Sequence, residues 1–227
     1  MAGLGSVANF FAIIVGSLIG MLFKNHFPVR MQKIVMQGLG LAVILIGLEM
    51  ALKTQNILIV IFSLVIGGII GELLDIEGKL NKMAIRIESK FKSKNDNFVK
   101  GFVQASLVFC VGAMAIMGAI QDGLNNDPSI LFNKSILDGF ASIAFAASFG
   151  IGVLFSAAAV LIYQGSITLF ASYIERFLSE AMVVEMTATG GLLILAIGLN
   201  IMGISETRVG NLLPAIFISV ILLYFVV

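Results

Sequence analysis

Long apolar runs alternate with short polar segments along almost the whole chain. A membrane-spanning helix needs about 20 mostly apolar residues, and several runs approach that length between loops that contain charges or glycines. The pattern predicts six clear spans, at Ser6–Phe23, Ile34–Leu52, Ile57–Leu74, Phe98–Ile120, Val183–Ile204 and Val209–Val227.

A further apolar stretch, Ile136–Tyr173, is too long for one span and just long enough for two. We expect it to break near Gly150, Gly152 and Ser156. Two spans here give eight in total, whereas one span with an interfacial or re-entrant segment gives seven. The sequence therefore predicts an all-α polytopic membrane protein with about eight, or alternatively seven, transmembrane helices.

The main polar segment, residues 76–97, has its own periodicity. Its apolar residues recur at spacings of three and four, which predicts an amphipathic helix lying along the lipid headgroups. These apolar residues are Ile76, Leu80, Met83, Ile87 and Phe91. The lysines and arginines between them predict a basic loop that fixes orientation, a contact with anionic lipid, or both.

The distribution of lysine and arginine predicts the orientation of the chain. Lys24, Arg30 and Lys33 follow the first span, and segment 76–97 is strongly basic. Because cytoplasmic loops carry an excess of Lys and Arg, both segments are expected in the cytoplasm and the N-terminus outside.

Two segments of the chain resemble each other. GLAVILIGLE, at Gly40–Glu49, aligns without gaps on GLLILAIGLN, at Gly191–Asn200. The alignment predicts two three-span units, 6–74 and 159–227, with two linking spans in 98–158. With eight spans the copies would insert in opposite directions, as in many secondary transporters. The alternative is chance agreement between two helices rich in Leu, Ile, Ala and Gly.

Composition supports a membrane environment. The 227 residues are 59% hydrophobic and 12% charged, whereas soluble domains are roughly half apolar and a quarter charged. We expect a single membrane domain over residues 1–227, with the lipid bilayer as its partner. The net charge of +1 does not indicate nucleic acid, and a single cysteine, Cys110, excludes an intramolecular disulfide.

Polar side chains inside the apolar runs are candidates for a transport pathway, because such groups usually face a bundle interior or a wet cavity. The candidates are Glu49, Gln104, Cys110, Gln121, Asp122, Asp138, Ser156, Gln164 and Asn200. Glu49 is also the candidate coupling group, although an interfacial carboxylate that meets water is an equal alternative. Gly150, Gly152 and Gly165 are candidate helix breaks; close helix packing is the alternative role for glycine.

Enzyme and metal chemistry find little support in the sequence. Cys110, Met114 and Met117 share a helix face that could hold a soft metal, but methionine there is more often packing material. His26 is the only histidine, and the chain has no HExxH, GxSxG or GxxxxGK motif. We expect no cofactor, no metal site and no enzymatic activity.

The segments CVGAMAIMGAIQDG, KSILDGF, FGIGVLFSA and YQGSITL together resemble the bacterial YdfK/YqgA group, a domain of unknown function (554). The resemblance covers the whole chain and implies a multi-pass protein of the bacterial inner membrane. It implies no substrate and supplies no site residues.

These observations lead to three functional hypotheses. The first is a small secondary transporter or permease for an ion or small solute, which works by alternating access between inverted halves. The second is an ion or solute channel, formed by one chain or by a homo-oligomer. The third is a membrane scaffold that contacts lipid or partners through its basic amphipathic helix.

Overall fold

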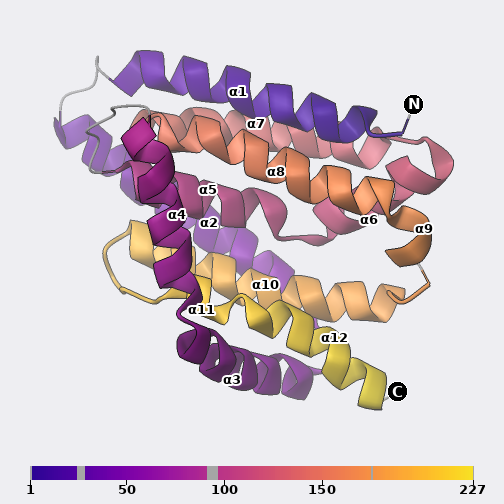
Figure 1. The fold of residues 1–227 in the computed structure, drawn as a ribbon. Helices are drawn as coiled ribbons and strands as arrows, with labels where there is room; N and C mark the ends of the chain where they lie inside the picture. Colours follow the sequence, from indigo (N-terminus) through magenta and orange to yellow (C-terminus); the bar gives the residue numbers. More distant parts are fainter. Residues whose placement is uncertain (1, 25–28, 91–96, 175, 227) are drawn as a thin grey trace. The chain divides into compact units, whose positions relative to one another are not determined.

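Helices make up nearly all of the described chain in a computed structural model (Figure 1). The structure describes residues 2–24, 29–90, 97–174 and 176–226. His26, Phe91, Lys92 and Lys94 lie outside these ranges. The helices are α1 (Leu4–Lys24), α2 (Val29–Ala51), α3 (Ile57–Leu74), α4 (Ile76–Lys90), α5 (Phe98–Cys110), α6 (Ala113–Asn125), α7 (Ser129–Phe149), α8 (Gly152–Leu169), α9 (Ala171–Ile174), α10 (Glu180–Ile201), α11 (Val209–Leu212) and α12 (Pro214–Val226).

Side chains on α1 are arranged in the opposite way to those of a helix in a soluble protein. Its exposed stripe consists of Leu4, Val7, Phe11, Val15, Leu18 and Leu22. The buried face carries Ser6, Asn9 and Ser17 together with Ile13. Apolar side chains outside and polar or small ones inside are expected when the surrounding medium is lipid.

Within the described residues, five helices are long and apolar enough to cross a membrane, or six if the bent pair α5–α6 is one span. Two shorter apolar helices, Gln37–Ala51 and Val209–Phe225, accompany them. The chain is therefore a multi-pass membrane protein in contact with the bilayer. Two long helices occupy the stretch Ile136–Tyr173, namely α7, which already begins at Ser129, and α8, and this confirms the two-helix prediction.

Two spans predicted as continuous are interrupted. The fourth divides into α5 and α6, bent by 60°, where Gly112 adopts φ +140°, a conformation that other residues rarely accept. The last divides into α11 and α12 at Leu213. Pro214 explains that second break, because proline has no N–H to donate to the preceding turn.

The chain divides into two compact units. Unit 1 comprises Met1–Met36, Met83–Cys110 and Met114–Phe177, and unit 2 comprises Gln37–Lys82, Val111–Ala113 and Leu178–Val227. In unit 1, α1 lies along α7 with α8 beside both (Figure 1), and α5 packs against α8. In unit 2, α3 packs along α11 and α12, and α10 contacts α3 and α12.

Close backbone contact sets the register of unit 1. A Cβ added to Gly16 would lie 2.2 Å from the Gly139 carbonyl oxygen, and one added to Gly20 would lie 2.3 Å from that of Ile143. The glycines thus let α1 and α7 meet without intervening side chains. This contact brings Asn9, which lies about two turns before Gly16 on the same face of α1, against the middle of α7.

Unit 2 is joined by polar contacts at its helix ends. The buried Glu185 carboxylate accepts from the Thr54 hydroxyl at 2.6 Å and from the backbone N–H groups of Gln55 and Asn56 at 2.8 and 3.1 Å. At the other end of α3, Glu72 accepts from Arg208 at 2.7 Å and from Asn211 at 2.5 Å. Both carboxylates accept hydrogen bonds from neighbouring segments and so hold the helix ends in place.

Candidate functional site

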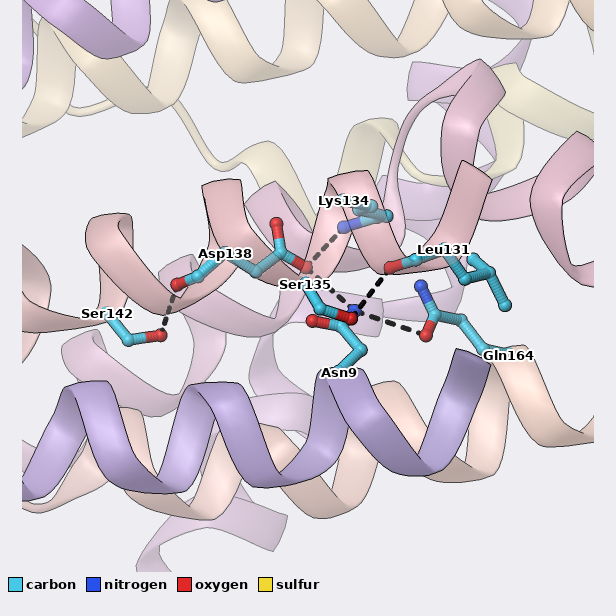
Figure 2. A network of polar contacts seen from close by, with 7 residues as sticks. All are labelled: Asn9, Leu131, Lys134, Ser135, Asp138, Ser142 and Gln164. Carbon is cyan, nitrogen blue, oxygen red and sulfur yellow. Dashed lines mark hydrogen bonds and ion pairs between the residues drawn. The ribbon is translucent and has the colours of Figure 1, made fainter. Parts of the chain in front are cut away.

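A buried polar network joins three helices of unit 1 (Figure 2). The Asn9 amide on α1 donates to Asp138 Oδ2 on α7 at 2.9 Å and to Gln164 Oε1 on α8 at 3.2 Å. Lys134, one turn before Asp138 on α7, forms an ion pair with the same Oδ2. The site is therefore a lysine–aspartate pair held from the side by an amide.

All four side chains of this network are buried. Asn9 and Gln164 have no exposed surface, and Lys134 and Asp138 are 6% and 7% exposed. Ionised side chains inside membrane spans are rare and mark ion paths, proton relays or substrate sites. Removing one partner of a buried ion pair costs about 3–5 kcal/mol, because the other charge is left uncompensated. The pair is thus the strongest candidate for a functional centre.

Nearby hydroxyl groups bond to their own helices and do not take part in the network. Ser135 donates to the Leu131 carbonyl at 2.7 Å, and Ser142 donates to that of Asp138 at 2.6 Å (Figure 2). These bonds leave Asp138 Oδ2 to Asn9 and Lys134.

Several buried polar atoms around the network have no hydrogen-bond partner among the described residues. Asn9 Oδ1 and Gln164 Nε2 are two of them, and Ser6 Oγ, Asp122 Oδ1 and Thr168 Oγ1 are three more in the same unit. Buried polar groups in proteins are normally satisfied, so each such group needs an explanation. Two of these atoms, Asn9 Oδ1 and Gln164 Nε2, belong to side chains of the network itself.

Asp122 connects α6 to this region. Its Oδ2 accepts from the backbone N–H of Gly5 at 3.1 Å. The neighbouring Gly123 touches α8, where an added Cβ would lie 2.3 Å from the Thr168 carbonyl oxygen. Asp122 therefore lies at the start of α1, about one helical turn from Asn9.

Two predicted pathway residues, Asp138 and Gln164, belong to the network through Asn9, and a third, Asp122, lies in the same unit. Ser156 is buried on α8 but donates to its own helix, at the Val153 carbonyl, at 2.6 Å. Gln104 and Cys110 are half-buried on α5. Among the described residues, none of these last three forms a hydrogen bond with the network.

Gln121 belongs to a separate contact outside the span. It donates to Asp127 Oδ2 at 2.5 Å, while the Ser129 hydroxyl and N–H donate to Oδ1 at 2.5 and 3.1 Å. These donors lower the pKa of Asp127 below its ordinary value of 3.8, the Ser129 hydroxyl most of all. Asp127 is thereby an ionised carboxylate that accepts the first N–H of α7, one residue before the N-cap Pro128.

Two predicted residues lie in unit 2, away from any buried network. The Glu49 side chain is 70% exposed and pairs with Lys53 at 3.3 Å. Asn200 accepts from the Ser205 hydroxyl at 2.6 Å and from the Thr207 N–H at 2.9 Å, which stabilises the turn after α10. The structure gives Asn200 a capping role and leaves Glu49 on an exposed face.

The three glycines considered as helix breaks differ. Gly150 ends α7 with φ +78°, and Gly152 begins α8 against the Phe98 carbonyl oxygen, where an added Cβ would lie 2.2 Å away. Gly165 lies inside α8, which continues to Leu169. The break expected there is absent, because one glycine weakens a helix by about 1 kcal/mol without ending it.

Lys134 and Asn9 are the site residues that sequence reasoning missed. The predicted span began at Ile136 and so left Lys134 in the preceding loop, although a lysine four residues before an aspartate is a signal for an ion pair on one helix face. Asn9 lies inside the predicted span Ser6–Phe23 and so had the same signal as Gln164, but its partners, more than a hundred residues away, could not be read from the sequence. Within the described ranges, no group of three His, Cys, Asp or Glu side chains could hold a metal ion.

Comparison with known proteins agrees with this description. Residues 4–224 match the family described as "Protein of unknown function (DUF554)". The chain is 34% identical to "Uncharacterized membrane protein YdfK" of Bacillus subtilis, over 97% of its length and 95% of that protein. It is 32% identical to "Uncharacterized protein YqgA" of Escherichia coli, over 95% and 94%. No solved structure matches. The chain therefore belongs to the DUF554 family of proteins.

Proposed function

We propose that this protein is a small secondary transporter or permease of the bacterial inner membrane, which moves an ion or small solute past the Lys134–Asp138 pair. The observation that supports it is the ion pair itself, buried in an apolar helix and bonded to α1 and α8 through Asn9. Such a pair gives a transport cycle two states: closed on itself, or opened by a bound ligand or proton.

An inverted repeat, which alternating access would use, has support in unit 2. A Cβ on Gly47 would lie 2.7 Å from the Gly191 carbonyl oxygen, and one on Gly40 would lie 3.2 Å from that of Gly198. The sequence alignment pairs Gly40 with Gly191 and Gly47 with Gly198. When each residue is replaced by its counterpart in the other copy, the contact Gly47–Gly191 becomes the contact Gly198–Gly40. A two-fold relation between α2 and α10 requires this exchange.

Helix boundaries support the same repeat. The alignment shifts each residue by 151, since Gly40 corresponds to Gly191. This shift places α2, Val29–Ala51, on 180–202, where α10 spans Glu180–Ile201. It places α3, Ile57–Leu74, on 208–225, where α11 and α12 together span 209–226.

Helix directions support eight crossings. Contacts of Gly5 with Leu131 and of Gly20 with Ile143 make α1 and α7 parallel, while Gly67 with Ala215 and Gly71 with Asn211 make α3 and α12 antiparallel. With eight crossings, α1 and α7 are the first and fifth, and α3 and α12 are the third and eighth. This count makes α1 parallel to α7 and α3 antiparallel to α12, as observed, provided that the bent pair α5–α6 crosses the membrane.

The basic helix α4 is proposed to contact anionic headgroups on the cytoplasmic side. Lys79 and Lys82 on this helix are exposed. Basic side chains near an anionic leaflet each contribute about 1 kcal/mol. This contact would orient the protein and is compatible with transport.

Flux in proteoliposomes tests the proposal. A panel of radiolabelled cations, anions and small organic solutes should include at least one that wild-type protein moves. Asp138→Asn should lower this flux by about tenfold or more, because 1.4 kcal/mol equals a factor of ten and the unpaired Lys134 costs more than that.

Glu49→Gln is the matched control, since it removes an exposed carboxylate that also pairs with a lysine four residues away. Its flux should equal that of the wild type. The double variant Lys134→Gln/Asp138→Asn removes both charges and checks that loss of flux is not loss of folding. A folded wild-type protein that moves nothing in the panel, or an Asp138→Asn variant with full flux, contradicts the proposal. Discrete single-channel currents would indicate a channel.

A further inference from the structure

Two atoms of the polar network in unit 1, Asn9 Oδ1 and Gln164 Nε2, have no hydrogen-bond partner within the described residues. Both side chains are fully buried. The other atom of each amide is engaged, because Asn9 Nδ2 donates to Asp138 Oδ2 at 2.9 Å and to Gln164 Oε1 at 3.2 Å. The two unpartnered atoms therefore lie at the outer ends of the joined amides (Figure 2), where buried polar atoms normally have a partner.

These two atoms are opposite in hydrogen-bonding character. Asn9 Oδ1 is a carbonyl oxygen, which can only accept, and Gln164 Nε2 is an amide nitrogen, which can only donate. A ligand that satisfies both must carry a donor and an acceptor. A bare metal cation would leave Gln164 Nε2 without a partner, and an anion without N–H or O–H groups would leave Asn9 Oδ1 without one.

The Lys134–Asp138 ion pair makes the same demand in terms of charge. A cargo cation that replaces Lys134 at Asp138 leaves the ammonium group uncompensated, and a cargo anion that replaces Asp138 at Lys134 leaves the carboxylate uncompensated. An uncompensated buried charge is strongly unfavourable, and the like-charged member of the pair repels such a cargo. A molecule that carries both charges supplies a partner to each side chain and adds no net charge to the interior.

We propose that the cargo is a small zwitterion with a primary ammonium group and a carboxylate, as in an amino acid. This substrate class rests on the proposed function. The carboxylate of the cargo accepts from Lys134 Nζ and Gln164 Nε2, and its ammonium group donates to Asp138 Oδ2 and Asn9 Oδ1. The cargo thus replaces the ion pair that Lys134 and Asp138 form with each other in the closed arrangement. Because these side chains come from positions about one helical turn apart, a short carbon chain separates the two charges of the cargo.

Binding to purified wild-type protein in detergent tests the substrate class without transport. The probes are the common α-amino acids, β-alanine and γ-aminobutyrate, screened by thermal unfolding and then measured by isothermal titration calorimetry. At least one should raise the thermal midpoint and bind. Its methyl ester, which keeps only the ammonium charge, and its N-acetyl derivative, which keeps only the carboxylate, are the matched controls. Each should bind about a hundredfold more weakly, because one member of the buried pair is left without a partner.

Single-charge variants should change which probe binds best. Lys134→Gln leaves the Asp138 carboxylate and should prefer the methyl ester to the parent amino acid. Asp138→Asn leaves the Lys134 ammonium group and should prefer the N-acetyl derivative. A purely structural ion pair would not exchange these preferences. Glu49→Gln, which removes one member of an exposed lysine–glutamate pair, should bind the parent amino acid as the wild type does.

A wrong substrate class and a wrong transport function give different results. A wild type that binds none of these amino acids, or binds the methyl ester or the N-acetyl derivative as tightly as the parent, overturns the zwitterion, even when the flux panel shows transport of an inorganic ion. Amino-acid binding with the expected preference, but no flux of any solute, overturns transport and supports the zwitterion as the ligand of this site. If a variant does not fold, the comparison of the three probes on the wild type decides.

Discussion

At the scale of single residues, the carboxylates of this chain are stabilised in different ways. Asp127 is half-buried and accepts hydrogen bonds from Gln121 and Ser129, which lower its pKa and keep it ionised beside the start of α7. Asp138 is buried and relies on Lys134 and Asn9. Asp122 is equally buried but receives one backbone N–H. Surroundings, and not residue type, therefore distinguish these three carboxylates.

Asp127 should stabilise the protein in a pH-dependent way. Its pKa is lowered in the folded state, so its contribution is fully present above the unfolded value of about 3.9 and is lost as pH falls through the folded value. Asp127→Ala should therefore lower the thermal midpoint of unfolding at pH 7. The difference in thermal midpoint between the wild type and the variant should become smaller below pH 3.8. Asn125→Ala serves as the control. A difference that is the same at pH 7 and in acid contradicts this role.

Prediction of single site residues from the sequence succeeded where a polar side chain interrupts an apolar run. Asp138 and Gln164 are polar groups in apolar runs, and both belong to the network. Lys134 was missed because the predicted span was begun at Ile136, after the last charged residue before the apolar run. Glu49 shows the opposite error, since a carboxylate beside an apolar run can pair with a lysine on an exposed face.

At the scale of helices, the crossing of α2 and α10 depends on glycine. Gly47→Leu or Gly191→Leu would push a side chain into the facing backbone, where an added Cβ already lies 2.5–2.7 Å from the partner helix. Overpacking of this kind costs about 1–3 kcal/mol. Each variant should lower the thermal midpoint in detergent. Gly38→Leu, on the same helix with nothing within 4 Å, should match the wild type; equal losses at all three positions contradict the crossing.

Helix boundaries were predictable to different degrees. The apolar run Ile57–Leu74 is helix α3 as observed, because Asn56 caps its start and Asp75 ends it. The proline at position 214 was a readable signal for the break between α11 and α12. The bend at Gly112 was not readable, because glycine is also common in straight membrane helices and its φ of +140° becomes evident only in the folded backbone.

At the scale of the whole molecule, composition was enough to predict an all-α membrane protein, since only helices of this length and hydropathy fit 59% apolar residues. The polar network was not predictable as a unit. Its members come from residues 9, 134, 138 and 164, and no local pattern connects positions so far apart.

The number of crossings gives a prediction for the full chain. An even number with the N-terminus outside predicts that a reporter fused after Val227 lies outside the cytoplasm. Alkaline phosphatase at that position should be active and green fluorescent protein dark. A fusion after Lys82, in the basic helix α4, should give the reverse pattern and is the control. Fluorescence from the C-terminal fusion would leave an odd number of crossings and no inverted copies.

The position of Lys134 and Asp138 on one helix, four residues apart, has an electrical consequence. Helix α7 carries no other ionisable side chain, so it is neutral as a body. Moving one elementary charge through 100 mV involves about 2.3 kcal/mol, and a neutral helix involves none. Membrane voltage therefore does no work on the displacement of α7, and any voltage dependence of turnover must come from the cargo or from a proton carried elsewhere in the bundle.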